Sequence, residues 1–144
     1  VLHEITFLEK KQEALTKYPP TRQKHKEMIN QNEGYNIIEA EHLKKLLTSN
    51  NATDILQGLF FLSFWDLDVL QDQITDFDFF DILKKYFDSP SETIRINAKV
   101  CLSYMDESII KEIILKETDI KELLASNNDE ALDAAAYLQK CLGQ

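Results

Sequence analysis

A short polar segment recurs along the chain: Leu47-Thr48-Ser49-Asn50-Asn51 returns as Leu124-Ala125-Ser126-Asn127-Asn128, and a looser copy, Phe87-Asp88-Ser89-Pro90-Ser91, lies between them. The first residues of successive copies are 40 and then 37 positions apart. A small residue follows each of these first residues by 11 positions, and the three are Gly58, Ala98 and Ala135. A period of about 40 residues built from helices is typical of helical-repeat proteins. The recurrence therefore predicts an all-α protein made of repeated helical units.

The composition agrees with a single helical domain. The chain has 144 residues, and domains of about 100 to 150 residues are the commonest size. Three glycines and three prolines are too few for the many tight turns of a β-sandwich or barrel. An apolar share of 44% argues against disorder. We therefore expect one folded helical domain with one core.

Polar turns and capping residues divide this predicted domain into an N-terminal cap and three repeats. In the cap, Tyr18-Pro19-Pro20 ends a first helix and Thr21 begins a second. Each of the first two repeats is predicted to contain three helices, and Asp66 and Asp106, 40 residues apart, are expected to cap the third helix. The small residue of each repeat should let two helices pack closely. The cap covers residues 1–36, and the repeats cover residues 37–76, 77–118 and 119–142.

The net charge of −9 is distributed unevenly. Residues 46–144 carry 8 Lys and Arg against 18 Asp and Glu, whereas residues 1–45 are nearly balanced. An acidic field repels phosphate backbones, so direct binding to nucleic acid is not expected. The same field attracts a basic protein and accelerates its approach. The charge therefore predicts a basic protein partner.

Aspartates are densest between residues 66 and 88, where large aromatic residues alternate with them. Two interpretations stay open: a solvated helix face with capping residues, or a negative surface that binds the basic partner. Aspartate favours the second, because its short side chain loses less entropy when it is fixed in an interface. Trp65 is likewise either a core residue or a surface anchor. The predicted partner-binding residues are Trp65, Asp66, Asp68, Asp72, Asp76, Asp78, Asp81, Asp106 and Glu107.

No pattern indicates catalysis, a cofactor or a metal. The sequence contains no GxSxG, P-loop or GxGxxG segment. The carboxylates between Asp66 and Asp72 alternate as in a calcium loop, but the turn glycine and the closing glutamate are missing. His3, His25 and His42 have no metal-binding spacing, and we expect them on the surface of helices. The sequence therefore predicts a protein that is not an enzyme and holds no cofactor or metal.

The two cysteines and the absence of long apolar stretches indicate a cytoplasmic protein. Cys101 and Cys141 lie within helical apolar patterns, so we expect free, buried thiols and a reducing compartment. No run of about 18 apolar residues could cross a membrane. The first residues, Val1-Leu2-His3-Glu4, lack the basic and apolar regions of a signal peptide. We therefore expect no contact with membranes.

Over residues 37–142 the chain resembles HEAT and armadillo repeats. The anchors Leu47, Phe87 and Leu124 and the small residues described above carry this resemblance. Three helices in a repeat are closer to armadillo than to HEAT, and the mid-repeat prolines and Asp-Arg pairs of many HEAT units are missing. The resemblance implies a short right-handed α-solenoid with an N-terminal helical cap that binds other proteins.

The size, the acidic balance and the lack of catalytic motifs also resemble the small all-helical immunity proteins that accompany bacterial contact-dependent growth inhibition toxins. That resemblance implies a 1:1 complex with a basic toxin domain, a nuclease, whose active site the acidic surface covers. The alternative is a generic HEAT-like scaffold or adaptor that holds a protein or peptide.

Overall fold

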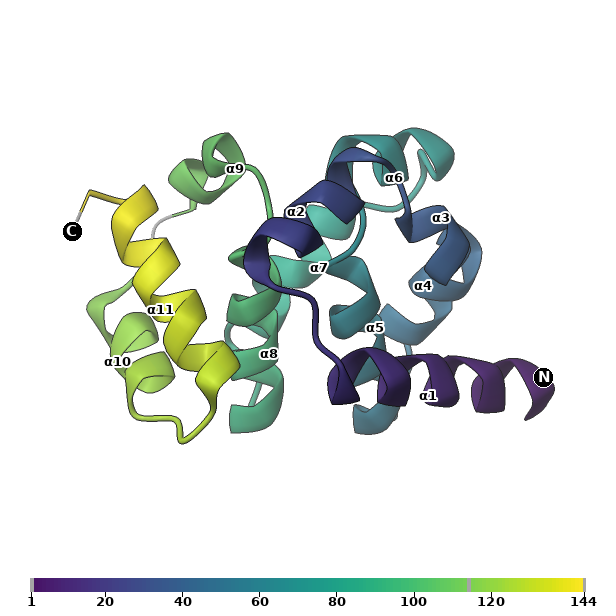
Figure 1. Cartoon of the computed structure of the whole chain (residues 1–144), viewed down its shortest axis with the longest axis horizontal. Coiled ribbons are helices and arrows are strands. Elements are labelled where there is room, and N and C mark those ends of the chain that lie inside the picture. Colours follow the sequence, from purple (N-terminus) through teal and green to yellow (C-terminus); the bar gives the residue numbers. More distant parts are fainter. Residues whose placement is uncertain (1, 114, 144) are drawn as a thin grey trace. The chain divides into compact units, whose positions relative to one another are not determined.

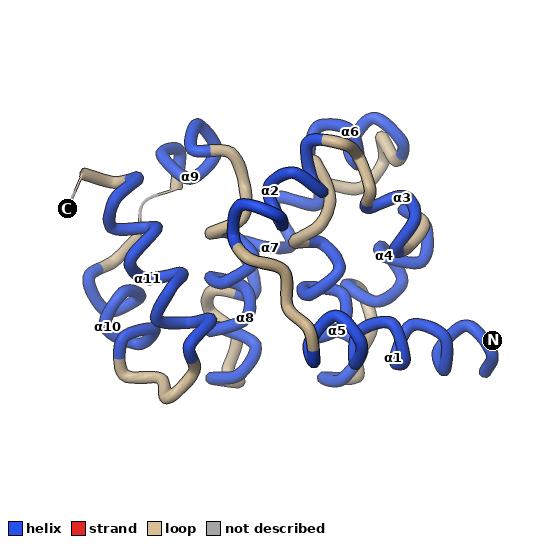
Figure 2. Tube along the Cα trace, viewed as in Figure 1, coloured by secondary structure: helices blue, strands red, loops and turns tan. Residues whose placement is uncertain are grey.

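The computed structural model of the chain describes residues 2–113 and 115–143, with side chains from residue 6 onward. Eleven helices and no strand occur in these residues (Figures 1 and 2), so the predicted all-α class is confirmed. The helices are α1 (Leu2–Lys17), α2 (Arg22–Asn30), α3 (Gly34–Ile37), α4 (Ala40–Leu47), α5 (Ala52–Leu62), α6 (Leu67–Gln73), α7 (Phe79–Tyr86), α8 (Glu92–Leu102), α9 (Glu107–Glu112), α10 (Glu117–Leu124) and α11 (Asp129–Cys141).

The helices begin and end at the recurring polar turns. Leu47, the first residue of the first turn, is the last residue of α4, and α5 starts at Ala52 directly after that turn. α10 ends at Leu124 and α11 starts at Asp129, on either side of the last turn. The helices beside these two turns therefore end and begin where the recurring polar segments predict. The four-residue helix α3 is an addition that the sequence pattern did not predict.

The chain divides into two compact units, which we call unit 1 (Val1–Ile82) and unit 2 (Leu83–Gln144). Unit 1 contains α1 to α6 and the first residues of α7, and unit 2 contains the rest of α7 and the helices that follow it.

In unit 1, α4 and α5 pack closely because a glycine lies where they meet. A Cβ atom added to Gly58 would be 2.9 Å from Cδ2 of Leu47 and 3.2 Å from Cβ of Leu46. A larger residue would therefore push the two helices apart. Close packing compensates the cost of a glycine inside a helix, which is about 1 kcal/mol relative to alanine. The role predicted for the small residue is confirmed at this position.

A second glycine lets α3 lie directly on the segment that follows α5. A Cβ atom on Gly34 would be 2.9 Å from both the backbone oxygen of Phe64 and Cγ of Trp65. The ring of Tyr35 then lies on Trp65, with 5.0 Å between ring centroids. Helix α3 thus covers the aromatic core that follows α5.

Helix starts are capped as predicted at two of three positions. The Thr21 hydroxyl accepts a hydrogen bond from a backbone N–H in the first turn of α2, at 3.2 Å. The Asp66 carboxylate accepts from the backbone N–H groups of Asp68 and Val69 at 2.9 and 3.2 Å, at the start of α6. Asp106 stands at the N-cap position of α9, but its side chain accepts no capping hydrogen bond. That prediction is wrong, since Asp106 is exposed and water can satisfy the free amides of this short helix.

Unit 2 is held together by buried ion pairs as well as by apolar packing. Lys99 on α8 is 2% exposed, and its ammonium lies 3.0 Å from carboxylate oxygens of both Asp119 and Glu122 on α10. The Arg95 guanidinium lies 3.0 Å from the same Glu122. The hydrogen bond from Arg95 holds the pKa of Glu122 below its ordinary value, although partial burial opposes this shift. Helix α11 packs on both α8 and α10, and its Ala135 is fully buried.

Candidate functional site: an acidic surface on unit 1

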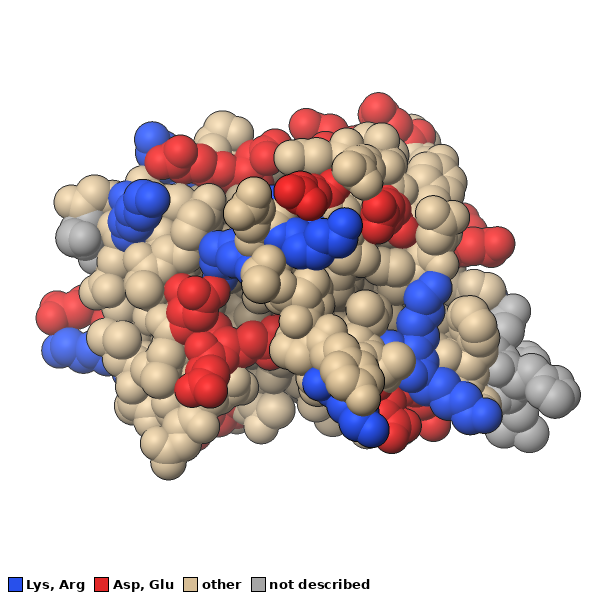
Figure 3. Space-filling view, in the orientation of Figure 1, with Lys and Arg blue, Asp and Glu red and all other residues tan. Residues whose placement is uncertain are grey.

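Unit 1 carries a concentrated group of aspartates on α6 and at the start of α7. Residues 46–82 contain seven Asp residues and no Lys or Arg. Six of the seven form what we call the acidic surface: Asp66, Asp68, Asp72, Asp76, Asp78 and Asp81. Asp66 is half-buried and the other five are exposed. Figure 3 shows acidic side chains gathered over the part of unit 1 that α6 forms.

Helix α6 presents its two aspartates on one face. Asp68 and Asp72 are four positions apart in the helix, so their side chains point to the same side. The carboxylate of Asp66, at the N-cap, accepts two backbone N–H bonds and lies at the positive end of the helix dipole. Helix capping therefore accounts for an aspartate at position 66. Asp72 lies in the last turn, where the helix dipole does not stabilise a negative charge.

The loop between α6 and α7 is held in place by Gln71. Its side-chain amide donates to the backbone oxygens of Ile74 (2.7 Å) and Phe77, and its side-chain oxygen accepts from the N–H of Phe79 at 3.2 Å. The loop that carries Asp76 is thereby fixed at three backbone groups. Gln71 was missed in the sequence, because no local pattern distinguishes a loop-bracing glutamine from an ordinary helix-surface glutamine.

The remaining aspartates lie on this loop and at the start of α7. The Asp78 carboxylate accepts from the backbone N–H of Asp81 at 3.0 Å and so caps α7. Lys44 on α4 lies with its ammonium 3.8 Å from a carboxylate oxygen of Asp76 and 5.5 Å from the ring centroid of Phe77. Among the described residues no other ion pair involves the acidic surface. Because the Asp76 side chain is 80% exposed, this pair leaves most of the surface charge facing solvent.

Trp65 does not belong to this surface. Its side chain is 3% exposed and lies beneath Tyr35, so the core interpretation is confirmed and its place among the partner-binding residues is wrong. In the described part of the chain, its indole Nε1 is the buried side-chain nitrogen that lacks a hydrogen-bond partner. Burying the ring in the aromatic core outweighs the cost of that unpaired N–H.

The last two predicted residues, Asp106 and Glu107, belong to unit 2. Both are exposed. Glu107 pairs with Lys111 within α9, with 3.5 Å between a carboxylate oxygen and the ammonium. Pairs of this kind on a helix surface stabilise it by only a few tenths of a kcal/mol. The structure therefore brings together six of the nine predicted residues in unit 1 and places these two outside that group.

His25 is buried, so the prediction of a surface histidine is wrong at this position. It is 4% exposed and stacks on Phe64 with 4.0 Å between ring centroids. Its Nε2 lies 2.9 Å from the backbone oxygen of Ser63, which can only accept, so Nε2 carries the proton. Burial lowers the pKa of His25 to about 4. The signal in the sequence was its position four residues before Ile29, on the buried face of α2.

The described residues offer little for catalysis or metal binding. Cys101 and Cys141 are free and buried, as predicted, and burial raises the pKa of the Cys101 thiol, which removes the reactive thiolate. No group of three or more His, Cys, Asp or Glu side chains suited to a metal ion occurs in the part of the chain that the structure describes. Within that same part, every helix is too short or too polar to cross a membrane.

No known protein-family model matches this chain, and no curated protein or solved structure matches it either. The acidic surface and its supports are therefore the basis for a functional proposal.

Proposed function

We propose that this chain is an immunity-type inhibitor that binds a basic protein through the acidic surface of unit 1 and blocks the partner's activity. The partner is a nuclease toxin domain whose nucleic-acid groove is positively charged, bound 1:1 in the cytoplasm. The observation that carries this proposal is the run of residues 46–82, with seven aspartates, no Lys or Arg, and five of those aspartates exposed on one part of unit 1.

The geometry supports binding by carboxylates that are ordered before the partner arrives. Asp66 and Asp78 are fixed by backbone N–H groups, and Gln71 holds the loop that carries Asp76. A short side chain on an ordered backbone loses little conformational entropy on binding. An interface built on these residues therefore gains affinity from preorganisation as well as from charge.

Charge complementarity would act mainly on the rate of association. Like-signed carboxylates on one surface raise the local concentration of a basic partner and steer its approach. Exposed charges are screened over about 8 Å at physiological ionic strength. The association rate of the complex should therefore fall steeply with salt, while the dissociation rate should change little.

We also propose that the helix groups stack as repeats of a short right-handed α-solenoid, with residues 1–36 as its cap. The matching caps of three helices support this arrangement: side chains of Asn51, Ser91 and Asn128 accept backbone N–H bonds at the starts of α5, α8 and α11. A cytoplasmic location is supported by the two free, buried cysteines.

A pull-down with the product of the neighbouring gene, followed by kinetic binding measurements at low and high salt, tests the proposal. The variant neutralises three exposed carboxylates of the acidic surface through Asp68→Asn, Asp72→Asn and Asp81→Asn. We expect its association rate to fall by about tenfold or more at low salt, because steering contributes factors of 10 to 10³. The absence of a salt-sensitive complex between the two wild-type proteins would contradict the proposal.

A matched control separates the local surface from the total charge. Glu92→Gln, Glu112→Gln and Asp129→Asn remove the same number of exposed charges from unit 2. The control should leave the association rate within about twofold of the wild type, since these residues are not part of the acidic surface defined above. Equal losses in both variants would show that net charge alone drives binding.

The second candidate is a scaffold or adaptor that holds a peptide, and an apolar groove in unit 1 favours it. The groove has a volume of about 520 Å³ and lies between α1 and the segment of α3 and α4. Phe7 and Tyr35 line it and are 60% and 53% exposed. Large exposed aromatic rings are common at protein-binding surfaces. Recovery of several unrelated partners in the pull-down would favour this candidate over inhibition of one toxin.

A further inference from the structure

Helix α5 carries a buried glutamine whose side chain has no partner. Gln57 is 4% exposed, and among the described residues its carboxamide makes no hydrogen bond or ring contact. Its neighbour Gly58 already serves the packing of α4 on α5, so Gln57 is not required at this position by the helix pair. Its carboxamide, which makes no hydrogen bond within the described chain, is therefore available to a ligand.

Gln57 lines a groove between α1 and α5 with a volume of about 570 Å³, which we call the α1–α5 groove. The other lining residues all come from α1: Glu9, Gln12, Glu13, Thr16 and Lys17. The carboxamide of Gln57 is not completely sealed from solvent, so a ligand can reach it through the groove. The α1–α5 groove thus has a neutral amide on its floor and charged residues along one wall.

The wall that α1 forms along the groove is polar. Glu9, Gln12, Glu13 and Thr16 follow the spacing i, i+3, i+4 and i+7, which places them on one face of the helix. Among the described residues, neither Glu9 nor Glu13 takes part in an ion pair. Two free carboxylates thus lie one helical turn apart, beside a carboxamide that has no partner.

These groups match the side chain of arginine, and we propose that the α1–α5 groove is a binding site for an arginine side chain of a protein or peptide. Its planar guanidinium has five N–H donors in a fixed fork. It can donate to the carboxylates of Glu9 and Glu13 and to the side-chain oxygen of Gln57, which together offer acceptors on two sides of the groove. A lysine ammonium has three donors at a single point and fits such a spread of acceptors less well.

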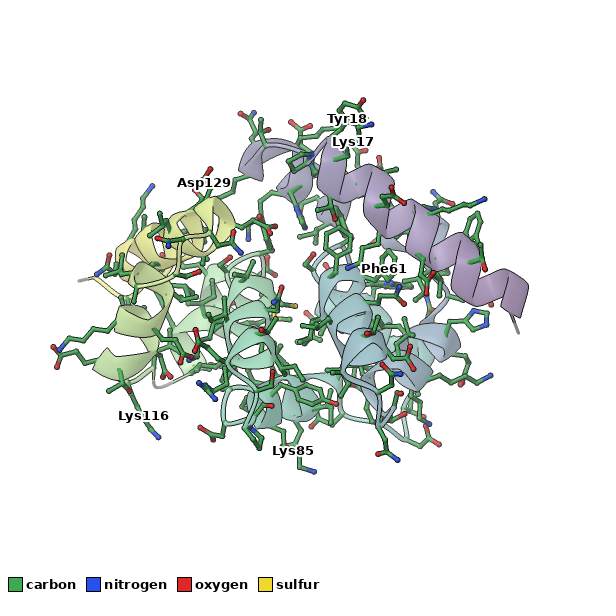
Figure 4. The ribbon with its side chains drawn as sticks, turned by 90° about the horizontal axis from the view of Figure 1, so that it is seen from below. Lys17, Tyr18, Phe61, Lys85, Lys116 and Asp129 are labelled. Carbon is green, nitrogen blue, oxygen red and sulfur yellow. The ribbon has the colours of Figure 1, made fainter. Side chains whose placement is uncertain are left out.

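Lys17 sets the position of the guanidinium within the groove. It lies at the C-terminal end of α1 together with Tyr18 (Figure 4), and its ammonium is 5.6 Å from the Tyr18 ring centroid. Two cations repel each other, so the guanidinium binds toward Glu9 and away from Lys17. This inference concerns a surface other than the acidic surface and does not depend on the proposed inhibition of a toxin.

The test follows the side-chain NH₂ resonances of Gln57 by two-dimensional NMR while N-acetyl-arginine methylamide is added to the full chain. We expect a saturable shift with a Kd on the order of millimolar, since a single side chain makes few contacts. N-acetyl-citrulline methylamide has the same shape without the charge and should cause no saturable shift. The lysine analogue should bind more weakly than the arginine compound. No saturable shift with arginine, or an equal shift with citrulline, would overturn the proposal.

Variants then assign the binding to the named groups, with backbone amides of α1 as the reporter. Gln57→Leu should weaken binding by about tenfold, because a hydrogen bond to a charged group is lost. The matched control Gln73→Leu changes an exposed glutamine of α6 and should leave binding unchanged. Unchanged binding in Gln57→Leu would overturn the role of the carboxamide.

Two further variants test the charges and do not alter the buried position. Glu9→Gln with Glu13→Gln should abolish measurable binding, and Lys17→Met should tighten it by about twofold, as expected for one exposed charge. Because Glu9, Glu13 and Lys17 are exposed on α1, both variants should fold even if Gln57→Leu does not. Weaker binding in the double glutamate variant together with tighter binding in Lys17→Met supports the site. A change of binding in the same direction in both variants would refute it.

Discussion

The burial of His25 predicts that unit 1 loses stability in mild acid. The ring is neutral in the folded protein because burial lowers its pKa to about 4, whereas the unfolded chain has a histidine pKa of about 6.5. A folded-state pKa below the unfolded value means that the unfolded chain binds more protons between these two values. The free energy of unfolding therefore falls as the pH drops from about 6.5 toward 4.

The two pKa values fix the size of this effect. Between about pH 7.5 and pH 5.5 the loss is about 1.3 kcal/mol, and the full loss below pH 4 approaches about 3 kcal/mol. The interval from about pH 7.5 to pH 5.5 reports most directly on His25, because most carboxylates stay ionised there. The cationic side chains of Arg22 and Lys26 add a smaller contribution of the same sign.

Urea unfolding monitored by the fluorescence of Trp65 measures this loss. The chain has one tryptophan, and Trp65 follows the Ser63 carbonyl and the Phe64 ring that hold His25, so the signal reports on unit 1. His25→Phe keeps the stacking and removes the titrating group, and its stability should be flat over this pH range. The control His42→Gln changes a half-buried histidine that pairs weakly with a surface glutamate and should retain the loss. A flat profile for the wild type would refute the reasoning.

Four other predictions concern ion pairs, packing and loop hydrogen bonds. Lys99→Met should destabilise unit 2 by about 2 kcal/mol, because it removes the buried cation that Asp119 and Glu122 share and leaves only Glu122 with an ion-pair partner, Arg95. Circular dichroism during urea unfolding would measure this loss, and a loss below about 1 kcal/mol would contradict that role. The pKa of Glu122 is lowered in the folded state, so its contribution to the free energy of unfolding should be present above about pH 4.5 and be lost as the pH falls through the pKa of the folded state. The variant Glu122→Gln should not show this loss. Gly34→Ala should be more destabilising than Gly58→Ala in thermal melts, because its Cβ would meet a backbone oxygen instead of a flexible leucine end. Gln71→Ala should release the α6–α7 loop and speed hydrogen exchange at its amides, whereas Gln73→Ala should not.

The helix positions could be predicted because local chemistry sets them. Asn51 and Asn128 recur in the same polar segment, and both cap the helix that follows. Gly58 was expected to permit close packing from its place in the repeat alone, and its contact with Leu47 confirms that. Features of this kind depend on residues within a few positions of one another or within one hairpin, so the sequence contains them directly.

The features that were missed depend on contacts between distant segments. His25 reaches Ser63 across 38 residues, and Lys44 reaches Asp76 from another helix. The prediction of a cap at Asp106 was wrong for a different reason: a suitable residue stands at the N-cap position, but its side chain makes no capping hydrogen bond. Residue type and spacing show which interaction is available, and tertiary packing decides whether it forms.

The distribution of charge between the two units explains why the acidic surface belongs to unit 1. Leu59 of unit 1 and Lys99 of unit 2 are 40 residues apart, which is the predicted repeat length. Both are buried, at 1% and 2% exposed, so the residue at this position is apolar in unit 1 and cationic in unit 2. The buried lysine holds Asp119 and Glu122, whose side chains are only 18% and 23% exposed. Residues 1–82 carry 8 Lys and Arg against 14 Asp and Glu, whereas residues 83–144 carry 8 against 11. Unit 2 therefore has fewer excess acids and uses two of them internally, so the charge available for a basic partner is concentrated on α6 and the start of α7.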